Sequence, residues 1–282
     1  MYEVRDKVVL VTGGAAGIGA GVVRAFLDEG AKHVAVLDVD TKNGIPLEKE
    51  LSDKHGSNSV KFYKCDVTTG DLEAAYDSVL KELGYIDVVI NCAGIMNDDR
   101  KVYLKEISVN LVTLITSSFK AYDIMRKDNG GKGGTIINIS SIVGLFHAPL
   151  LPVYAATKTA VLQFSNSLGM PPHYPRSGVR VLTLCFGCTD TSLFSTSKMA
   201  AFDKVSNDML VQSIGTLPMQ TPQSAVKGLI DTYKQGESGS TWLITSDEPA
   251  KDITDNVKKG FDIMSQGVFP TGEKEYINLL KE

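Results

Sequence analysis

Short apolar runs alternate with amphipathic stretches along most of the chain. The runs are rich in Val, Ile and Leu, and we predict strands over residues 7–12, 33–38, 60–65, 86–91, 134–140, 179–186 and 240–245. Apolar residues at helical spacing predict helices between them, among others over 17–30, 72–83, 103–126 and 154–168. Nearly continuous apolar strands are typical of a sheet that is buried on both faces. The pattern therefore predicts an α/β fold, a Rossmann-like doubly wound seven-stranded parallel sheet with helices on both faces.

No break in composition divides the chain, and we expect a single dinucleotide-binding and catalytic domain over residues 1–282. A helix should begin at Pro222, with Thr221 as its cap, and end before Gly236. Two segments interrupt the alternation of strands and helices. We interpret residues 189–218 as a flap over the substrate and residues 249–282 as a peripheral C-terminal extension.

A glycine-rich turn, Thr12 to Gly19, follows the first predicted strand and opens a helix. Such glycines allow a tight turn and a close approach of a pyrophosphate, whose charge is stabilised at the helix N-terminus. Asp38, at the end of the second strand, follows at the spacing of about 20 residues that suits a carboxylate bound to the adenosine ribose. Because this carboxylate would repel a 2′-phosphate and no Arg or Lys lies beside it, NAD is favoured over NADP. The alternatives are a plain strand–helix connection and an ordinary strand-end Asp.

The third and fourth predicted strands end in Cys65-Asp66-Val67 and Asn91-Cys92-Ala93-Gly94, where the adenine and its ribose would lie. Asp66 is equally suited to cap the helix that follows. The candidate cofactor-binding residues of this half are Thr12, Gly13, Gly17, Ile18, Gly19, Asp38, Val39, Cys65, Asp66, Val67, Asn91, Ala93 and Gly94.

Tyr154 and Lys158 lie four residues apart on a predicted helix, which places them on one face. Ser140 and Ser141 end the preceding strand, at the same edge of the sheet. Removal of a hydride from an alcohol carbon requires a base for the hydroxyl proton. A neighbouring ammonium lowers the pKa of a tyrosine, so Lys158 would help Tyr154 to act as that base. Alone, a Tyr-x-x-x-Lys pair is more often a surface feature; together with the glycine turn it indicates an active site.

Composition limits the classes of function further. The net charge of −4 gives no basic surface for nucleic acid, and no run of about 18 apolar residues predicts a membrane span. The charged N-terminus enters a strand directly, so we expect no signal peptide and a cytoplasmic location. The four cysteines are too few for a disulfide framework, and the single pair Cys185 and Cys188 cannot complete a zinc site, so we expect no metal.

The chain resembles the short-chain dehydrogenase/reductase superfamily in its classical branch, from about residue 6 to 245. Within that branch it is similar to NAD-dependent 15-hydroxyprostaglandin dehydrogenases and fruit-fly-type alcohol dehydrogenases. The matching residues are Thr12, Gly13, Gly17, Ile18, Gly19, Asn91, Cys92, Ala93, Gly94, Asn110, Ser141, Tyr154 and Lys158. The resemblance implies that Tyr154 is the general acid/base, that Lys158 supports it and binds the nicotinamide ribose, and that Ser141 rather than Ser140 binds the substrate oxygen. It also implies that Asn110 helps to hold a water-mediated proton relay.

Two departures from the family pattern concern the pocket. Phe186-Gly187 replaces the usual Pro-Gly after the sixth strand, while the resemblance still places Gly187, Thr189 and Thr191 beside the cofactor. Prostaglandin dehydrogenases carry a polar residue where this chain has Leu150 and Leu151, which indicates a more apolar substrate. The candidate pocket walls are Phe146, Leu150, Leu151, Cys188 and Phe194, for each of which ordinary core or lid packing is the alternative.

The sequence thus predicts an NAD-dependent oxidoreductase for a small lipophilic secondary alcohol or ketone. The alternative is a catalytically silent dinucleotide-binding or storage protein on the same fold. The helix predicted over 103–126 carries apolar residues that suit either core packing or pairing of subunits, and we expect a homodimer or homotetramer.

Overall fold

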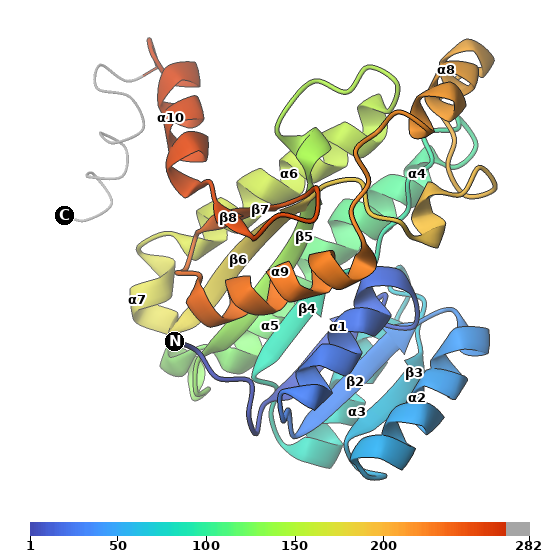
Figure 1. Ribbon diagram of the computed structural model, residues 1–282. Helices are drawn as coiled ribbons and strands as arrows, with labels where there is room; N and C mark the ends of the chain where they lie inside the picture. Colours follow the sequence, from blue (N-terminus) through green and yellow to red (C-terminus); the bar gives the residue numbers. More distant parts are fainter. Residues whose placement is uncertain (269–282) are drawn as a thin grey trace.

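Eight strands form one sheet in the order β3-β2-β1-β4-β5-β6-β7-β8 in the computed structural model, which describes residues 1–268 (Figure 1). The strands are β1 (Val8–Thr12), β2 (His33–Asp38), β3 (Val60–Lys64), β4 (Val88–Asn91), β5 (Gly134–Ser141), β6 (Val179–Phe186), β7 (Thr241–Ile244) and β8 (Lys251–Asp252). The first seven are parallel, and β8 pairs with β7 in the antiparallel sense. The doubly wound α/β class and its seven parallel strands are confirmed. β8 is an additional edge strand of two residues, too short for a hydrophobic pattern to reveal.

Helices cover both faces of the sheet. Helices α1, α2 and α9 pack on one face, and α3, α5 and α6 on the other (Figure 1). The helices are α1 (Gly17–Asp28), α2 (Thr41–His55), α3 (Asp71–Leu83), α4 (Tyr103–Ile107), α5 (Thr113–Met125), α6 (Pro152–Gly169), α7 (His173–Ser177), α8 (Lys204–Ile214), α9 (Pro222–Gln235) and α10 (Thr254–Met264). The expected start of α9 is confirmed: Pro222 is its first residue, and the Thr221 hydroxyl accepts a hydrogen bond from the Ser224 amide at 3.2 Å.

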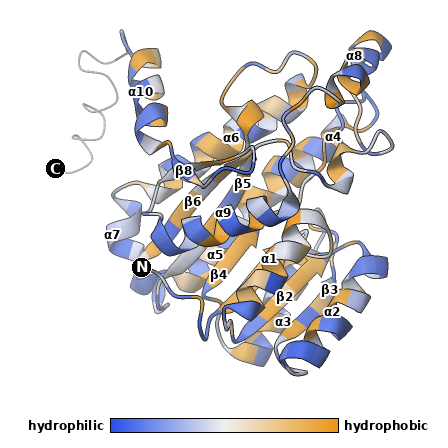
Figure 2. Cartoon of the chain, in the orientation of Figure 1, coloured by the Kyte–Doolittle hydropathy of each residue, from blue (hydrophilic) through white to orange (hydrophobic). Residues whose placement is uncertain are grey.

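The apolar strands form the centre of two hydrophobic layers. In β1, Val9 and Val11 face the layer beneath α1 and α9, whereas Val8 and Leu10 face the layer beneath α3 and α5. Successive strand residues point to opposite faces, so a strand covered on both sides is apolar at nearly every position. Figure 2 shows the same distribution, with hydrophobic strands inside and hydrophilic outer helix faces. Each buried Val or Leu contributes about 1.5–3 kcal/mol of transfer free energy.

The helix expected over residues 103–126 is interrupted. A π-helical turn, Ser108–Val112, separates α4 from α5. At this turn the buried side chain of Asn110 binds the backbone of Ile95 twice: its Oδ1 accepts from the Ile95 amide at 2.9 Å and its Nδ2 donates to the Ile95 carbonyl at 2.8 Å. The hydrophobic spacing could not reveal this interruption, because the apolar positions continue through it. π-helical turns of this kind frequently occur at functional sites.

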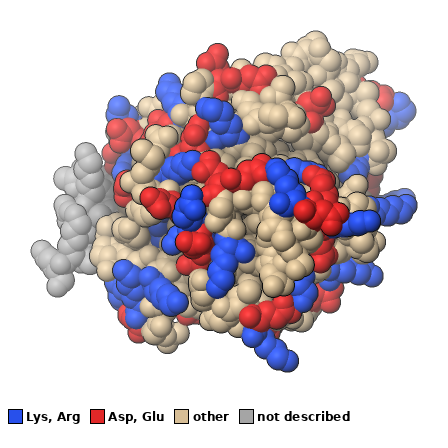
Figure 3. All heavy atoms as spheres, turned by 60° about the horizontal axis from the view of Figure 1, so that its bottom comes forward, with Lys and Arg blue, Asp and Glu red and all other residues tan. Residues whose placement is uncertain are grey.

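The two segments that interrupt the sequence pattern have structure of their own. Residues 189–218 contain α8, and this segment touches the loop after β4, where Asn97 forms a bridge with Ala200. Of the expected C-terminal extension, residues 249–268 form β8 and α10, and residues 269–282 lie outside the described part. No helix within residues 1–268 combines the length and the apolar character needed to cross a membrane. Acidic and basic side chains intermingle on the face shown in Figure 3.

Candidate active site

The glycine-rich turn lies where the carboxyl end of β1 meets α1. Gly13 has a φ of +68°, and a Cβ atom on it would lie 2.8 Å from the Ala93 Cα, so neither the conformation nor the space admits a side chain. Helix α1 begins at Gly17, and Ala16 before it supplies no side-chain cap, which leaves the first amides of the helix available to an anion. Thr12, Ile18 and Gly19 complete this cradle, which fits the pyrophosphate of a dinucleotide.

Asp38 ends β2 beside this turn. Its Oδ2 accepts a hydrogen bond from the Ala15 amide at 3.0 Å, and its Oδ1 accepts from the Asp40 amide at 3.0 Å. The carboxylate is thus fixed next to the cradle, in a place where a ribose could be bound. Val39, which follows it, has an exposed side chain.

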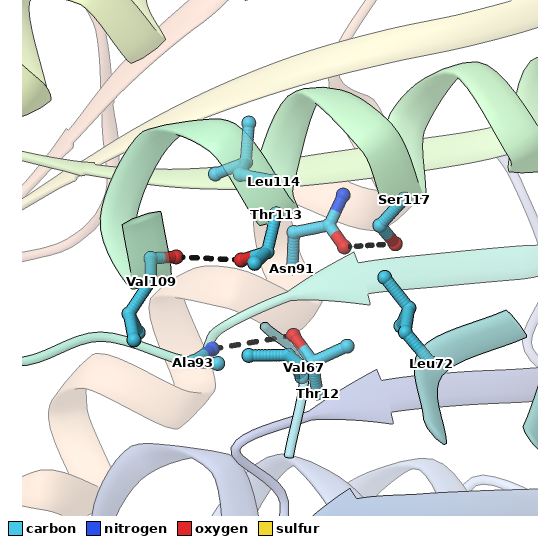
Figure 4. Close-up of a pocket in the computed structure, with 9 residues that line it drawn as sticks. All are labelled: Thr12, Val67, Leu72, Asn91, Ala93, Val109, Thr113, Leu114 and Ser117. Carbon is cyan, nitrogen blue, oxygen red and sulfur yellow. Dashed lines mark hydrogen bonds between the residues drawn. The ribbon is translucent and has the colours of Figure 1, made fainter. Parts of the chain in front are cut away.

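The carboxyl ends of β3 and β4 form a small cavity next to the cradle (Figure 4). The Thr12 hydroxyl lies between these segments and accepts from the amides of Cys92 and Ala93 at 3.2 and 3.3 Å. The cavity is lined by Thr12, Val67, Leu72, Asn91, Ala93, Val109, Thr113, Leu114 and Ser117. With a volume of about 10 Å³, the cavity has room for about one water molecule and is too small for an adenine.

Two candidates at the end of β3 have local structural roles. The Cys65 side chain is buried in the core between the sheet and α3. The Asp66 Oδ1 accepts from the Thr68 amide at 3.0 Å and from the Thr68 hydroxyl at 2.6 Å. These hydrogen bonds lower the pKa of Asp66 and hold the turn before α3. The N-cap of α3 is Gly70, so Asp66 does not cap the helix, as the alternative from the sequence had it.

Asn91 belongs to a buried polar network. Its Nδ2 donates to Asn138 Oδ1 at 2.8 Å and to the Ser118 hydroxyl at 3.1 Å, and its Oδ1 accepts from the Ser117 hydroxyl at 2.6 Å. Figure 4 shows the bond to Ser117. Because all these groups are buried, the network ties β4 and β5 to α5. The Asn91 side chain is thus engaged in the protein interior, and a contact of Asn91 with the cofactor stays a prediction for its backbone.

Tyr154 and Lys158 lie on consecutive turns of α6, and both side chains are buried. The Lys158 Nζ lies 5.6 Å from the centroid of the Tyr154 ring and donates to the Ile139 carbonyl at 3.0 Å. Burial lowers the pKa of Lys158 to about 8. Burial also raises the pKa of Tyr154, and a hydrogen bond with Ser141 opposes that rise. Both groups are thus removed from their ordinary titration behaviour, as is common at functional sites.

The two serines at the end of β5 are used differently. The Ser140 hydroxyl donates to the Lys158 carbonyl at 2.7 Å, so it fastens α6 to the sheet. The Ser141 hydroxyl is the one that adjoins the Tyr154 phenol. Its other contacts are both long: it donates to the Phe186 carbonyl and accepts from the Val143 amide, each at 3.4 Å. The arrangement leaves Ser141 rather than Ser140 free to bind a substrate oxygen.

Asn110 and Lys158 approach Gly94 from two sides. A Cβ atom on Gly94 would lie 3.4 Å from the Asn110 Oδ1 and 3.8 Å from the Lys158 Nζ. The structure thus brings Asn110, Ser141, Tyr154 and Lys158 together at the carboxyl edge of the sheet, beside the glycine turn.

The segment after β6 contributes the far side of the cradle. A Cβ atom on Gly17 would lie 3.4 Å from the Thr191 Cγ2, so Thr191 faces the glycine turn. Thr189 is buried; its hydroxyl donates to the Gly187 carbonyl at 3.0 Å and accepts from Gln220 at 2.9 Å. These bonds occupy Thr189 in holding its own loop, and Gly187 packs tightly against Thr245.

An apolar cluster surrounds Tyr154. Its buried members are Met96, Leu151, Tyr154, Met199, Ala201 and Leu210, and its partly buried members are Val143, Leu150, Leu193, Phe194 and Ile214. Leu150, Leu151 and Phe194 were expected as pocket walls, and the structure places them here. Phe146 is 56% exposed and lies outside the cluster, because the loop after β5 turns its side chain toward solvent. Cys188 is also outside the cluster, although it lies near enough to influence the Tyr154 phenol.

Sequence reasoning missed several residues of this region. Met96, Met199 and Leu210 come from separate segments, and no spacing in the sequence connects them. A buried pair of carboxyls, Asp98 and Glu106, lies behind Tyr154. The sequence carries one sign of this pair: Glu106 is an acidic residue at a position of the predicted helix where an apolar residue is expected. Among residues 1–268 no three metal-ligating side chains are grouped to hold an ion.

Known proteins share this organisation. The chain is 36% identical over 192 residues to rat (Rattus norvegicus) 15-hydroxyprostaglandin dehydrogenase (NAD(+)), covering 68% of this chain and 71% of that protein. It is 34% identical over 193 residues to alcohol dehydrogenase 1 of Ceratitis cosyra, covering 68% and 73%. The resemblance to these two groups of dehydrogenases is thereby confirmed.

Solved structures agree with the fold. A 3-quinuclidinone reductase from Rhodotorula rubra, described as NADPH-dependent, matches with a TM-score of 0.71 at 26% identity over 88% of this chain and 92% of that one. A 3-ketoacyl-(acyl-carrier-protein) reductase from Brucella melitensis, complexed with NADH, matches with a TM-score of 0.72 at 21% identity over 86% and 98%, which shows the fold alone. The short chain dehydrogenase family model matches residues 7–201, and the chain belongs to that family.

Proposed function

We propose that this protein is an NAD-dependent oxidoreductase that transfers a hydride between nicotinamide and a lipophilic secondary alcohol or ketone, with Tyr154 as the general acid/base. Membership of the family makes it an oxidoreductase that binds a nicotinamide cofactor. The observation that carries the finer proposal is the arrangement of Tyr154 with Lys158 on one side and Ser141 on the other, beside the glycine turn.

In the direction of alcohol oxidation, the nicotinamide supplies the acceptor for the hydride from the alcohol carbon. Tyr154 takes the hydroxyl proton, and the Lys158 ammonium stabilises the phenolate that must exist before this transfer. Ser141 donates a hydrogen bond to the substrate oxygen and holds it near the phenol. Lys158 also binds the nicotinamide ribose, and Asn110 helps to hold water through which the proton leaves the site. Reduction of a ketone reverses these transfers.

The choice of NAD is supported by Asp38. Its fixed carboxylate can accept hydrogen bonds from the hydroxyls of an adenosine ribose, whereas it repels a 2′-phosphate at short range. The glycine turn and the first turn of α1 hold the pyrophosphate, and Val67, Ala93 and the backbone of Asp66 receive the adenine. Thr191 contacts the cofactor from the opposite wall.

The lipophilic nature of the substrate is supported by the cluster around Tyr154. Leu150, Leu151 and Phe194 line it together with Met96 and Met199, and these side chains bind carbon chains or rings without hydrogen bonds. Residues 189–218 form the flap that closes over the bound substrate. The relatives named for prostaglandin and alcohol oxidation act on hydroxyl groups, which agrees with this assignment.

We propose further that the protein acts as a homodimer or homotetramer. Leu104, Val112 and Phe119 are exposed along α4, the π-helical turn and α5, as on a helix face that pairs with a second copy. Light scattering of the purified chain measures the mass directly, and a monomer at micromolar concentration would overturn this part.

The function is tested by cofactor absorbance with a panel of secondary alcohols. We expect reduction of NAD by medium-chain or cyclic alcohols and little by short ones. Tyr154→Phe should lose about 10²–10⁴-fold in kcat, the usual share of general acid–base catalysis, while NAD binding persists. Undiminished turnover in this variant would contradict the mechanism. Binding of NAD with no turnover of any alcohol or ketone would favour the silent dinucleotide-binding alternative.

A further inference from the structure

Two carboxyl side chains are buried behind the site. Asp98, in the loop between β4 and α4, is 1% exposed, and Glu106, in α4, is 0% exposed. Carboxyls that share a buried place cannot both ionise without a large energetic penalty, so the pair retains one proton. The question is which of the two carries it.

Asp98 is placed to carry the negative charge. Its Oδ2 accepts from the Val153 amide at 2.6 Å, and its Oδ1 accepts from the Tyr154 amide at 3.0 Å. These amides belong to the first turn of α6, where Leu151 provides no side-chain cap. A carboxylate at this position satisfies two helix N–H groups and interacts favourably with the helix dipole. Asp98 therefore caps the helix that carries Tyr154.

Glu106 is placed to carry the proton. Its Oε1 accepts from the Asn97 amide at 2.8 Å, whereas its Oε2 receives no hydrogen bond from any described N–H or O–H group. An oxygen with this environment fits a protonated carboxyl that donates to Asp98. Burial and the neighbouring Asp98 raise the pKa of Glu106 to about 8. Burial also raises the pKa of Asp98, and the hydrogen bonds from the Val153 and Tyr154 amides and from Glu106 oppose that rise.

The pair also lies between the flap and α6. The Asp98 amide donates to the Ala200 carbonyl at 2.8 Å, and the Asn97 side chain donates to the Lys198 carbonyl at 3.1 Å. Residues 198–200 are part of the flap, and Met199 between them belongs to the apolar cluster around Tyr154. These contacts together join the flap to the N-terminus of α6.

We propose that Glu106 is a positioning residue of the dehydrogenase site: its protonated carboxyl holds Asp98 against the first turn of α6 and keeps a second negative charge away from Tyr154. This inference rests on the proposed function. Asp98, Tyr154 and Lys158 are the titratable groups that face Glu106. Cys92 and Cys188 also face the Tyr154 phenol, and both remain neutral thiols because burial raises the pKa of each.

The charge of Glu106 determines the direction of the effect. An ionised Glu106 raises the pKa of Tyr154, because a second anion opposes formation of the phenolate. Below a pH of about 8 Glu106 is protonated and carries no charge, so it does not oppose formation of the Tyr154 phenolate. Above that pH the native side chain ionises, and the phenolate becomes harder to form.

The variant Glu106→Gln separates charge from shape. Its amide still donates to Asp98 and still accepts from the Asn97 amide, but it does not ionise. We expect kcat for alcohol oxidation to match that of the native chain below pH 7 and to exceed it increasingly above pH 8, by up to about tenfold for a one-unit change in the pKa of Tyr154. Glu73→Gln, at an exposed position on α3, is the matched control and should leave the pH profile unchanged.

A second measurement does not depend on turnover. The phenolate absorbance of Tyr154, taken as the difference from the corresponding Tyr154→Phe protein, should appear at lower pH in Glu106→Gln than in the native chain. Superimposable phenolate titrations would overturn the proposal, as would a pH profile of kcat equal to the native one. If Glu106→Gln shifts the titration while the native chain oxidises no alcohol, the coupling stands and the proposed function fails.

Glu106→Ala tests the hydrogen bond itself. Loss of the donor frees Asp98, and we expect kcat to fall more than KM rises, at every pH. A variant that unfolds at lower temperature yet keeps the native kcat would show a merely structural role and overturn the proposal.

Discussion

The Lys158 Nζ lies 5.6 Å from the centroid of the Tyr154 ring, and its hydrogen bond to the Ile139 carbonyl holds it beneath that ring. Among residues 1–268 no carboxylate forms an ion pair with this buried ammonium, so its charge acts on the phenol through a medium of low polarity. Coulomb interactions are several times stronger there than in water. The same burial makes the lysine expensive to keep charged, which links catalysis to stability.

Replacing Lys158 by Met should stabilise the protein and inactivate it. The pKa of Lys158 is lowered in the folded state to about 8, below its ordinary value, so the unfolded chain binds a proton that the folded chain binds less readily. The folded state therefore loses stability as the pH falls toward and through 8, and Lys158→Met removes this loss. We expect a higher unfolding temperature at pH 7 by calorimetry, together with a fall in kcat of about 10²–10⁴-fold.

Lys227→Met is the control for that experiment, because Lys227 is exposed and pairs with Asp231 on the surface of α9. It should change neither quantity appreciably. A Lys158→Met protein that is less stable than the native chain at neutral pH would show that its hydrogen bond outweighs the cost of burying its charge.

Asp38→Ala should narrow the preference for NAD over NADP. Removal of the carboxylate deletes both the ribose acceptor and the repulsion of a 2′-phosphate, so kcat/KM for NAD should fall while that for NADP rises. We expect the ratio of the two to drop by about 10–100-fold, as for a change of 1.4–2.8 kcal/mol in relative binding. Steady-state kinetics with both cofactors measures this ratio.

Asp40→Ala is the matched control, because Asp40 also follows β2 but caps α2 through the amides of Lys42 and Asn43. In this variant the ratio of kcat/KM for NAD to that for NADP should stay at the native value. Equal use of NAD and NADP by the native chain would refute the role of Asp38.

The two serines of β5 should separate chemistry from stability. Ser141→Ala removes the hydroxyl beside the phenol and should lower kcat by about tenfold or more, the effect of one hydrogen bond to a reacting oxygen. Ser140→Ala removes the bond to the Lys158 carbonyl and should lower the free energy of unfolding by about 1 kcal/mol. Kinetics and urea unfolding on both variants decide the assignment; the reverse pattern would make Ser140 the substrate ligand.

Asn91→Ala should destabilise the fold more than it affects the cofactor. The change removes the hydrogen bonds of Asn91 to Ser117, Ser118 and Asn138, and each lost bond costs about 0.5–1.5 kcal/mol. We expect a large fall in unfolding temperature, with the dissociation constant for NAD nearly unchanged in the fraction that folds. A selective loss of NAD affinity in a stable variant would restore Asn91 to the cofactor site.

The sequence predicted those features that depend on local pattern. The strands that lie inside the sheet are mostly apolar, and the glycine turn requires residues without side chains, so both left clear signals. The π-helical turn at Asn110 left no signal in the sequence, because it depends on a contact with Ile95, which lies outside the predicted helix. The lining of the apolar cluster was equally hidden, since Met96 and Met199 meet only when the flap packs on the loop after β4.

The partners of a buried polar side chain could not be predicted from the sequence. Asn91 lies in a segment that resembles a cofactor-binding motif. Its side chain, however, is hydrogen-bonded to Asn138 and thereby connects β4 with β5. Spacing along a chain cannot distinguish these roles, because both place an amide at the end of a strand. Only the partners across the sheet do so.

The antiparallel strand β8 affects the tendency of the protein to aggregate. It covers the outer edge of β7, whose residues Thr241–Ile244 are apolar and well suited to β-structure. An uncovered edge of this kind is a template for strand addition from another molecule. With Lys251 and Asp252 on the outermost strand, the sheet ends in opposite charges that discourage such growth. A change that detaches β8 would thus act first on aggregation and domain swapping, before it reaches the chemistry at Tyr154.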